Sequence, residues 1–111
     1  LYQQILPQLS STAILASNTS GLGLAGLGAD LPLARRQRFC GLHFFNPPRY
    51  MRLVELIPGP DTDASVLDLL ELCLTRVLGK CVVRAKDSPN FIANRIGILN
   101  LVGALQLAEQ F

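Results

Sequence analysis

Short apolar runs of strand length alternate with a clearly amphipathic segment along this chain. A run of 4 to 8 apolar residues bounded by turn-forming residues is typical of a buried strand. The runs are TAILAS (12–17), FCGLHFF (39–45), RLVELI (52–57) and CVVRA (81–85). Only NPPRYM (46–51) separates the second run from the third, and its two prolines favour a chain reversal. The pattern therefore predicts four strands, two of them joined by a tight turn.

A helix is predicted between Thr62 and Leu78, because apolar residues recur there at every third or fourth position. The residues of this stripe are Val66, Leu69, Leu70, Cys73 and Val77. Asp61 or Thr62 is suited to cap the amino end, and Gly79 to close the carboxyl end. Strands that alternate with helices in this way predict a mostly parallel sheet with helices outside it.

The last segment of the chain has a different character. Ser88 suits a helix cap and Pro89 the first helical position. An apolar stripe at helical spacing then continues to the carboxyl end: Ile92, Ile96, Leu99, Val102 and Leu105. Since no strand follows it, the stripe has no remaining partner in the chain. We interpret residues 88–111 as the first helix of a second, helical domain.

Three glycines stand in the spacing G-x-G-x-x-G, at Gly21, Gly23 and Gly26. This pattern lets a backbone approach the pyrophosphate of NAD when it follows a buried strand and opens a helix. A strand-like run does precede the glycines, but the polar residues 17–20 intervene. No acidic residue for the ribose follows a second strand at the required distance. A dinucleotide fingerprint and a decoy both stay open on this pattern alone.

Composition and charge narrow the classes of partner. Half of the 111 residues are apolar and 16% are charged, which is typical of a globular protein. A net charge of +2 argues against nucleic acid as the main partner. The cluster Arg35, Arg36 and Arg38 is interpreted as a solvated turn, with a phosphate role as the alternative.

Neither a membrane span nor a metal site is predicted. The longest uncharged apolar stretch, 96–108, contains two polar residues and is shorter than the roughly 20 residues that a span needs. The 3 cysteines are odd in number and form no C-x-x-C pair. They indicate reduced, buried thiols in an intracellular protein, and we expect a cytoplasmic location.

The only histidine, His43, lies near the end of a predicted strand, where open α/β sheets place their ligand sites. Glu55 lies on the next strand, and the intervening turn can fold it back toward His43. A histidine oriented by a carboxylate acts as a general base. The alternatives are a hydrogen-bonded structural histidine and an ordinary carboxylate at a strand edge.

Three segments together resemble a known family. In their order and spacing, ASNTSGL, FCGLHFFNPPRYMRLVELIPG and AKDSPNFIANRIG are similar to the middle of L-3-hydroxyacyl-CoA dehydrogenases. The form HFFNPPRYM is most similar to the enzymes in which an enoyl-CoA hydratase is joined to the dehydrogenase. The resemblance implies an α/β fold in which residues 1–87 are the C-terminal half of a Rossmann-type NAD-binding domain. Residues 88–111 would begin an all-helical C-terminal domain for substrate binding or dimerisation.

The resemblance also places the family's glycine fingerprint upstream of this segment, which makes Gly21, Gly23 and Gly26 a decoy. It implies an NAD-dependent enzyme that oxidises (S)-3-hydroxyacyl-CoA to 3-oxoacyl-CoA in fatty-acid β-oxidation. NAD would be the cofactor and an acyl-CoA the substrate. We also expect the parent protein to be a homo-oligomer and this chain to be inactive by itself.

The resemblance assigns roles to five residues. His43 would be the catalytic base and Glu55 its partner. Ser20 would contact both the nicotinamide of NAD and the substrate, Asn46 would line the NAD site, and Asn94 would face the substrate. Taken singly, Ser20 also suits a helix cap, Asn46 a turn before proline, and Asn94 an exposed helix face.

Two rival functions stay open at this point. One is a non-catalytic structural or binding member of the same fold family, since a fold does not fix its chemistry. The other is a related dehydrogenase that acts on a different β-hydroxy acid. Turnover of CoA esters and of free acids would discriminate between the dehydrogenases.

Overall fold

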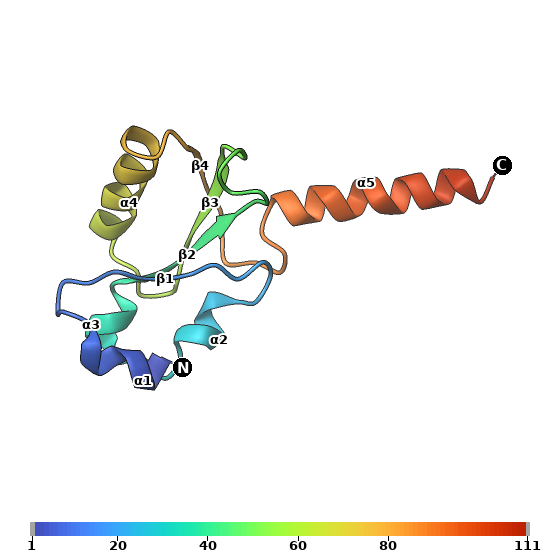
Figure 1. Cartoon of the computed structure of the whole chain (residues 1–111). Coiled ribbons are helices and arrows are strands. Elements are labelled where there is room, and N and C mark those ends of the chain that lie inside the picture. Colours follow the sequence, from blue (N-terminus) through green and yellow to red (C-terminus); the bar gives the residue numbers. More distant parts are fainter. Residues whose placement is uncertain (1, 111) are drawn as a thin grey trace.

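The computed structural model describes residues 2–110 and is drawn in Figure 1. Its elements in chain order are α1 (Tyr2–Ile5), η1 (Leu6–Gln8), β1 (Leu15–Ser17), α2 (Leu24–Gly28), α3 (Leu33–Arg36), β2 (Phe39–Phe44), β3 (Leu53–Pro58), α4 (Ala64–Arg76), β4 (Cys81–Arg84) and α5 (Ala93–Ala108). The strands predicted from the apolar runs are all present, with their ends moved by a few residues.

One 4-stranded sheet with the order β1-β2-β3-β4 organises the molecule. β1 pairs with β2 and β3 with β4 in parallel, whereas β2 and β3 are antiparallel. Each parallel pair needs a crossover, which α2 and α3 provide on one side of the sheet and α4 on the other (Figure 1). The mostly parallel sheet and the chain reversal after β2 are thus confirmed.

The two faces of the sheet bury separate apolar clusters. Leu24 of α2 packs with Phe39 and Ile57 on one face, and α4 covers the other. Gly41 allows the close approach of α2, because a Cβ at this position would lie only 3.0 Å from Cδ1 of Leu24. His43 follows Gly41 by two positions and therefore points from the same face of β2.

The amphipathic helix α4 differs from its prediction at the cap and in its buried face. Asp63 is the N-cap residue, in place of Asp61 or Thr62. Asp61 instead pairs with Arg36, and the Thr62 hydroxyl accepts a hydrogen bond from the Gly59 amide at 2.7 Å. The buried residues of the helix are Val66, Leu67 and Leu74. Of the predicted stripe, Leu69, Cys73 and Val77 are exposed, because the sheet contacts the helix along a neighbouring line.

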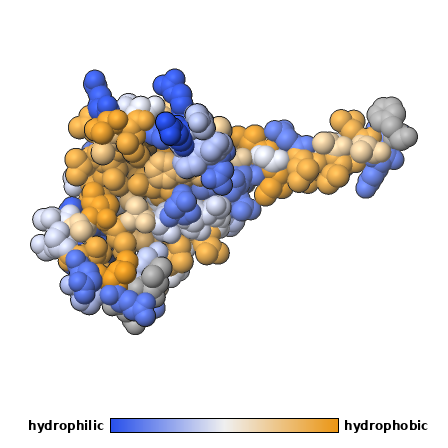
Figure 2. All heavy atoms as spheres, in the orientation of Figure 1, coloured by the Kyte–Doolittle hydropathy of each residue, from blue (hydrophilic) through white to orange (hydrophobic). Residues whose placement is uncertain are grey.

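Helix α5 begins later than predicted and projects from the sheet (Figure 1). Its N-cap is Ile92, where the sequence suggested Ser88, because Asn90 and Phe91 have φ values of 62° and 49° that no right-handed helix accepts. The projection gives the molecule a longest dimension of 58 Å. Apolar side chains run along the projecting helix (Figure 2), and those of the predicted stripe are exposed: Ile92, Ile96, Leu99, Val102 and Leu105. Within residues 2–110, no helix has the length and hydropathy needed to cross a bilayer.

Candidate active site

His43 and Glu55 are directly opposite each other in the antiparallel pairing of β2 with β3. Nδ1 of His43 lies 2.7 Å from Oε2 of Glu55. The two residues are 4% and 1% exposed, so the contact is shielded from bulk water. The side-by-side arrangement predicted from the turn between the strands is present, and it follows from the register of one hairpin.

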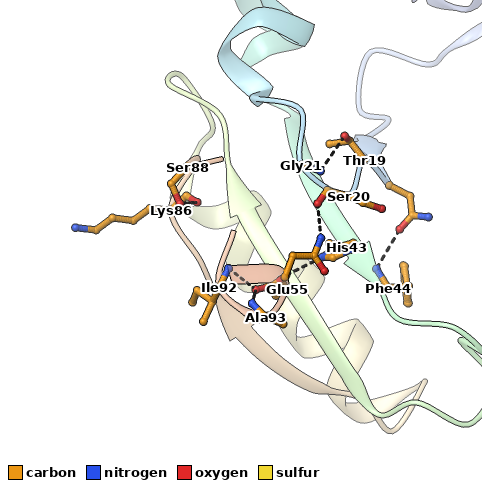
Figure 3. Close-up of polar contacts among 12 residues, drawn as sticks. Thr19, Ser20, Gly21, His43, Phe44, Glu55, Lys86, Ser88, Ile92 and Ala93 are labelled. Carbon is orange, nitrogen blue, oxygen red and sulfur yellow. Dashed lines mark hydrogen bonds and ion pairs between the residues drawn. The ribbon is translucent and has the colours of Figure 1, made fainter. Parts of the chain in front are cut away.

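The second carboxylate oxygen of Glu55 binds the amino end of α5 (Figure 3). Oε1 accepts hydrogen bonds from the backbone amides of Ile92 and Ala93, both at 2.9 Å. The negative charge thereby lies at the positive end of the helix dipole. With three donors on its two oxygens, the carboxylate is held in one orientation.

With Glu55 as a carboxylate, the hydrogen bond assigns the proton of the His43 ring to Nδ1. A carboxylate can only accept, so Nδ1 must be the protonated nitrogen and Nε2 keeps its lone pair in the neutral ring. The rings of Phe45 and Phe91 pack around the imidazole, with centroids at 4.5 and 5.6 Å. An imidazole fixed in this way can accept a proton at Nε2.

The polar segment after β1 is held by its own side chains. Oδ1 of Asn18 accepts a hydrogen bond from the Phe44 amide at 3.0 Å and so joins the ends of β1 and β2. Oγ1 of Thr19 accepts one from the Leu22 amide at 3.0 Å and a longer one from the Gly21 amide, which Figure 3 shows. Sequence reasoning missed both residues, although Asn and Thr commonly bond the backbone of turns.

Of the other predicted site residues, Ser20 and Asn94 are brought together. Nδ2 of Asn94 donates to the backbone carbonyl of Ser20 at 2.6 Å. Ser20 is exposed, and its hydroxyl makes no hydrogen bond among the described residues. Asn46 lies in the exposed turn after β2 and makes no hydrogen bond with the other predicted site residues. Nζ of Lys80 ties this turn to the body of the protein by donating to the carbonyls of Pro48 and Met51.

The glycine pattern opens α2, as a fingerprint would, but the helix end is already occupied. The amides of Leu24 and Ala25 donate to the two oxygens of Asp87, at 2.8 and 2.9 Å. A pyrophosphate would need these same donors. The structure therefore supports the interpretation of the glycines as a decoy. Asp87 was not found from the sequence, because it acts on residues more than 60 positions away.

Among residues 2–110, no group of three His, Cys, Asp or Glu side chains is arranged to hold a metal ion. Of the three cysteines, which the sequence predicts to be buried, Cys40 is buried and Cys73 and Cys81 are exposed. Cys40 lies on β2 and points to the face opposite His43, where burial raises the pKa of its thiol to about 11. Such a thiol stays protonated and is a poor nucleophile at neutral pH.

Comparison with known proteins gives a family match. The family model described as 3-hydroxyacyl-CoA dehydrogenase, NAD binding domain, matches residues 1–88. A putative fatty acid oxidation complex trifunctional enzyme of Rickettsia prowazekii is 48% identical over 111 residues, which cover 98% of this chain and 15% of that protein. A probable 3-hydroxyacyl-CoA dehydrogenase of Deinococcus radiodurans is 41% identical over 115 residues, covering 100% of this chain and 32% of the relative.

Solved structures show the same similarity. FadB2 of M. tuberculosis superposes with a TM-score of 0.81 at 36% identity, covering 92% of this chain and 35% of FadB2. The (S)-3-hydroxybutyryl-CoA dehydrogenase PaaH1 of Ralstonia eutropha superposes with a TM-score of 0.72 at 40% identity, covering 84% and 33%. The chain thus spans about a third or less of the length of each of these relatives.

Proposed function

We propose a catalytic role for this chain, which belongs to the 3-hydroxyacyl-CoA dehydrogenase family and matches the NAD-binding domain of that family. In this proposal it supplies the catalytic base and the nicotinamide side of the cofactor site to an enzyme that oxidises (S)-3-hydroxyacyl-CoA to 3-oxoacyl-CoA. The observation that carries the proposal is the buried contact of 2.7 Å between His43 and Glu55. A histidine that is held by a carboxylate in this way is suited to remove a hydroxyl proton.

His43 takes the proton of the substrate's 3-hydroxyl group at Nε2. Glu55 holds the Nδ1 proton, keeps the ring in place and offsets the positive charge that the imidazole gains. Bound NAD would supply the hydride acceptor for the carbon that carries this hydroxyl. The packed Phe45 and Phe91 rings exclude water from the imidazole, which strengthens its interaction with the carboxylate.

The residues of this chain fit the nicotinamide end of NAD and leave the pyrophosphate to other groups. β1 and β2 pair in parallel, so their carboxyl ends meet at one edge of the sheet, where α/β folds bind dinucleotides. The exposed polar side chains of Ser20 and Asn46 follow these two strand ends. The amides at the start of α2 are bound to Asp87 and do not provide a phosphate cradle.

Three further roles belong to the proposal. Ser20 contacts the nicotinamide and the substrate, Asn46 lines the cofactor site, and Asn94 faces the substrate. The hydrogen bond from Asn94 to the Ser20 carbonyl supports a common site for these two residues. The exposed position of Asn46 is compatible with a ligand contact, and no further observation supports it.

The experiment that tests the proposal compares variants of the full-length protein in an NADH-formation assay with a 3-hydroxyacyl-CoA. We expect His43→Gln to lower kcat by about 100- to 10,000-fold, the contribution of a general base. Ser65→Ala, an exposed change on α4, is the control and should keep wild-type turnover. Turnover of His43→Gln at the wild-type rate would contradict the proposal.

The same assay separates the rival functions. A protein that binds NAD but turns over no CoA ester or free acid would be a non-catalytic member of the family. A preference for free β-hydroxy acids would indicate a related dehydrogenase. The homo-oligomeric state, the cytoplasmic location and the domain boundary between residues 87 and 88 stay predictions.

A further inference from the structure

The chain between β4 and α5, residues 85–92, is called the linker here, and residues 18–23 between β1 and α2 are called the serine loop. The linker reaches the far end of the serine loop through Asp87. Its carboxylate binds the amides of Leu24 and Ala25, immediately after the loop, at 2.8 and 2.9 Å. Two distant segments of the sequence are thus joined where the proposed cofactor site begins.

Helix α2 has no cap of its own. It contains 5 residues, and Gly23 at the N-cap position has no side chain to bind the first amides. A helix this short is unstable without external contacts. Asp87 supplies what is missing, because a carboxylate accepts charge-assisted hydrogen bonds and offsets the positive helix end. The first turn of α2 therefore depends on the linker.

The serine loop needs such an anchor because two of its residues are glycines. Gly21 and Gly23 have no positive φ, so neither position uses the backbone freedom that favours glycine. Glycines cost more conformational entropy when they are ordered than other residues do. Asn94 fixes one end of this stretch through the Ser20 carbonyl, and Asp87 fixes the other end.

We propose that Asp87 is a positioning residue for Ser20. By holding the first turn of α2, Asp87 fixes the course of the serine loop and with it the place where the Ser20 hydroxyl meets its ligands. The inference rests on the proposed function, in which Ser20 contacts nicotinamide and substrate. Because the hydroxyl has no hydrogen bond of its own within residues 2–110, its place is set through the backbone.

A double-mutant cycle in the full-length protein tests whether the two residues act together. We expect Asp87→Ala and Ser20→Ala each to lower kcat/KM for the CoA ester by about tenfold, the scale of one lost positioning contact. The double variant should lose little more than either single variant, because a misplaced serine no longer contributes. If the two losses multiply, Asp87 does not act through Ser20.

A second substitution separates positioning from a general loss of stability. Gly23 has φ −62° and ψ 130°, the extended conformation of an N-cap residue, and a Cβ there would meet only Asp87, at 3.8 Å. In the Asp87→Ala background, Gly23→Ser therefore offers a local cap to α2. We expect it to restore kcat/KM to within about threefold of the wild type. Asp63→Ala is the matched control, since Asp63 precedes α4 without a side-chain cap bond.

Hydrogen exchange gives a readout that does not depend on activity. In Asp87→Ala the amides of Leu24 and Ala25 should exchange faster, while those of Ile92 and Ala93, bound by Glu55, should not change. Unchanged exchange at Leu24 and Ala25 would overturn the proposal even if activity fell. Faster exchange together with wild-type activity of Ser20→Ala would also overturn it, whereas failure of the proposed function would appear as wild-type turnover of His43→Gln.

Discussion

Replacement of Glu55 by glutamine tests whether one carboxylate sets the proton on the base. The wild-type side chain accepts three hydrogen bonds, from His43 and from the amides of Ile92 and Ala93. Glutamine keeps the shape but has one accepting oxygen and one donating amino group. With the amino group toward α5, two backbone donors would lose their acceptor, at about 1–3 kcal/mol each. With the amino group toward His43, both amides keep their acceptor.

The second orientation is therefore favoured, and it changes the tautomer of the imidazole. An amino group that donates to Nδ1 leaves the ring proton on Nε2, the nitrogen proposed to take the substrate proton. We expect Glu55→Gln to lower kcat by about 100- to 10,000-fold, as loss of a general base does. Affinity for NAD should stay within about twofold, because Glu55 is not one of the residues proposed to contact NAD.

Two measurements check this prediction. Steady-state NADH formation gives kcat, and ¹⁵N NMR of the His43 ring reports which nitrogen carries the proton. Glu71→Gln, the same substitution on α4 in a half-exposed ion pair with Arg84, is the matched control and should keep wild-type turnover. Wild-type turnover of Glu55→Gln, or a lost turnover with the proton still on Nδ1, would refute the reasoning.

Three further outcomes are expected. Asn94→Ala should lower turnover of the CoA ester more than NAD affinity, because Asn94 lies at the start of α5, beyond the strand ends of the proposed cofactor site. Titration that shows only weaker NAD binding would contradict this. Burial raises the pKa of the Cys40 thiol to about 11, above its ordinary value of 9.0. The thiol ionises at lower pH in the unfolded chain than in the folded protein. Its contribution to the unfolding free energy, about 2–3 kcal/mol, is therefore fully present below about pH 9 and is lost as pH rises through about 11. Urea unfolding across this range should show the loss, and Cys40→Ala should remove it. Gly21→Ala should lower the unfolding free energy by about 1 kcal/mol, because its Cβ would lie 2.6 Å from Oδ1 of Asn90 and would force that side chain to move. Gly23→Ala should lower it less, because its Cβ would meet no atom closer than 3.8 Å. Equal effects in thermal unfolding would be inconsistent with this packing.

The parts of the fold that local pattern controls could be predicted from the sequence. Apolar runs marked the four strands, and the two prolines after β2 indicated the reversal that places Glu55 opposite His43. That pair follows from one hairpin, whose register depends only on residues close in sequence. The candidate base and its partner were therefore accessible without a structure.

The remaining contacts join distant segments and leave no local signal. Ser88 and Pro89 suit a helix start, yet α5 begins at Ala93 because Phe91 is buried in a left-handed conformation and Glu55 binds the following amides. The hydrogen bonds from α2 to Asp87 are equally non-local. Both cases show a tertiary contact overriding a local preference that is weaker than the contact.

The two hydrogen bonds from Ile92 and Ala93 to Glu55 hold α5 at its first residues only. The 16 residues of α5 extend about 24 Å from this point, at about 1.5 Å per residue. A tilt of about 10° about the bonded end would move the far tip by about 4 Å, while the amides at the pivot would hardly move. These hydrogen bonds therefore fix the start of α5 beside the imidazole and leave the direction of its far end to whatever its apolar sides contact.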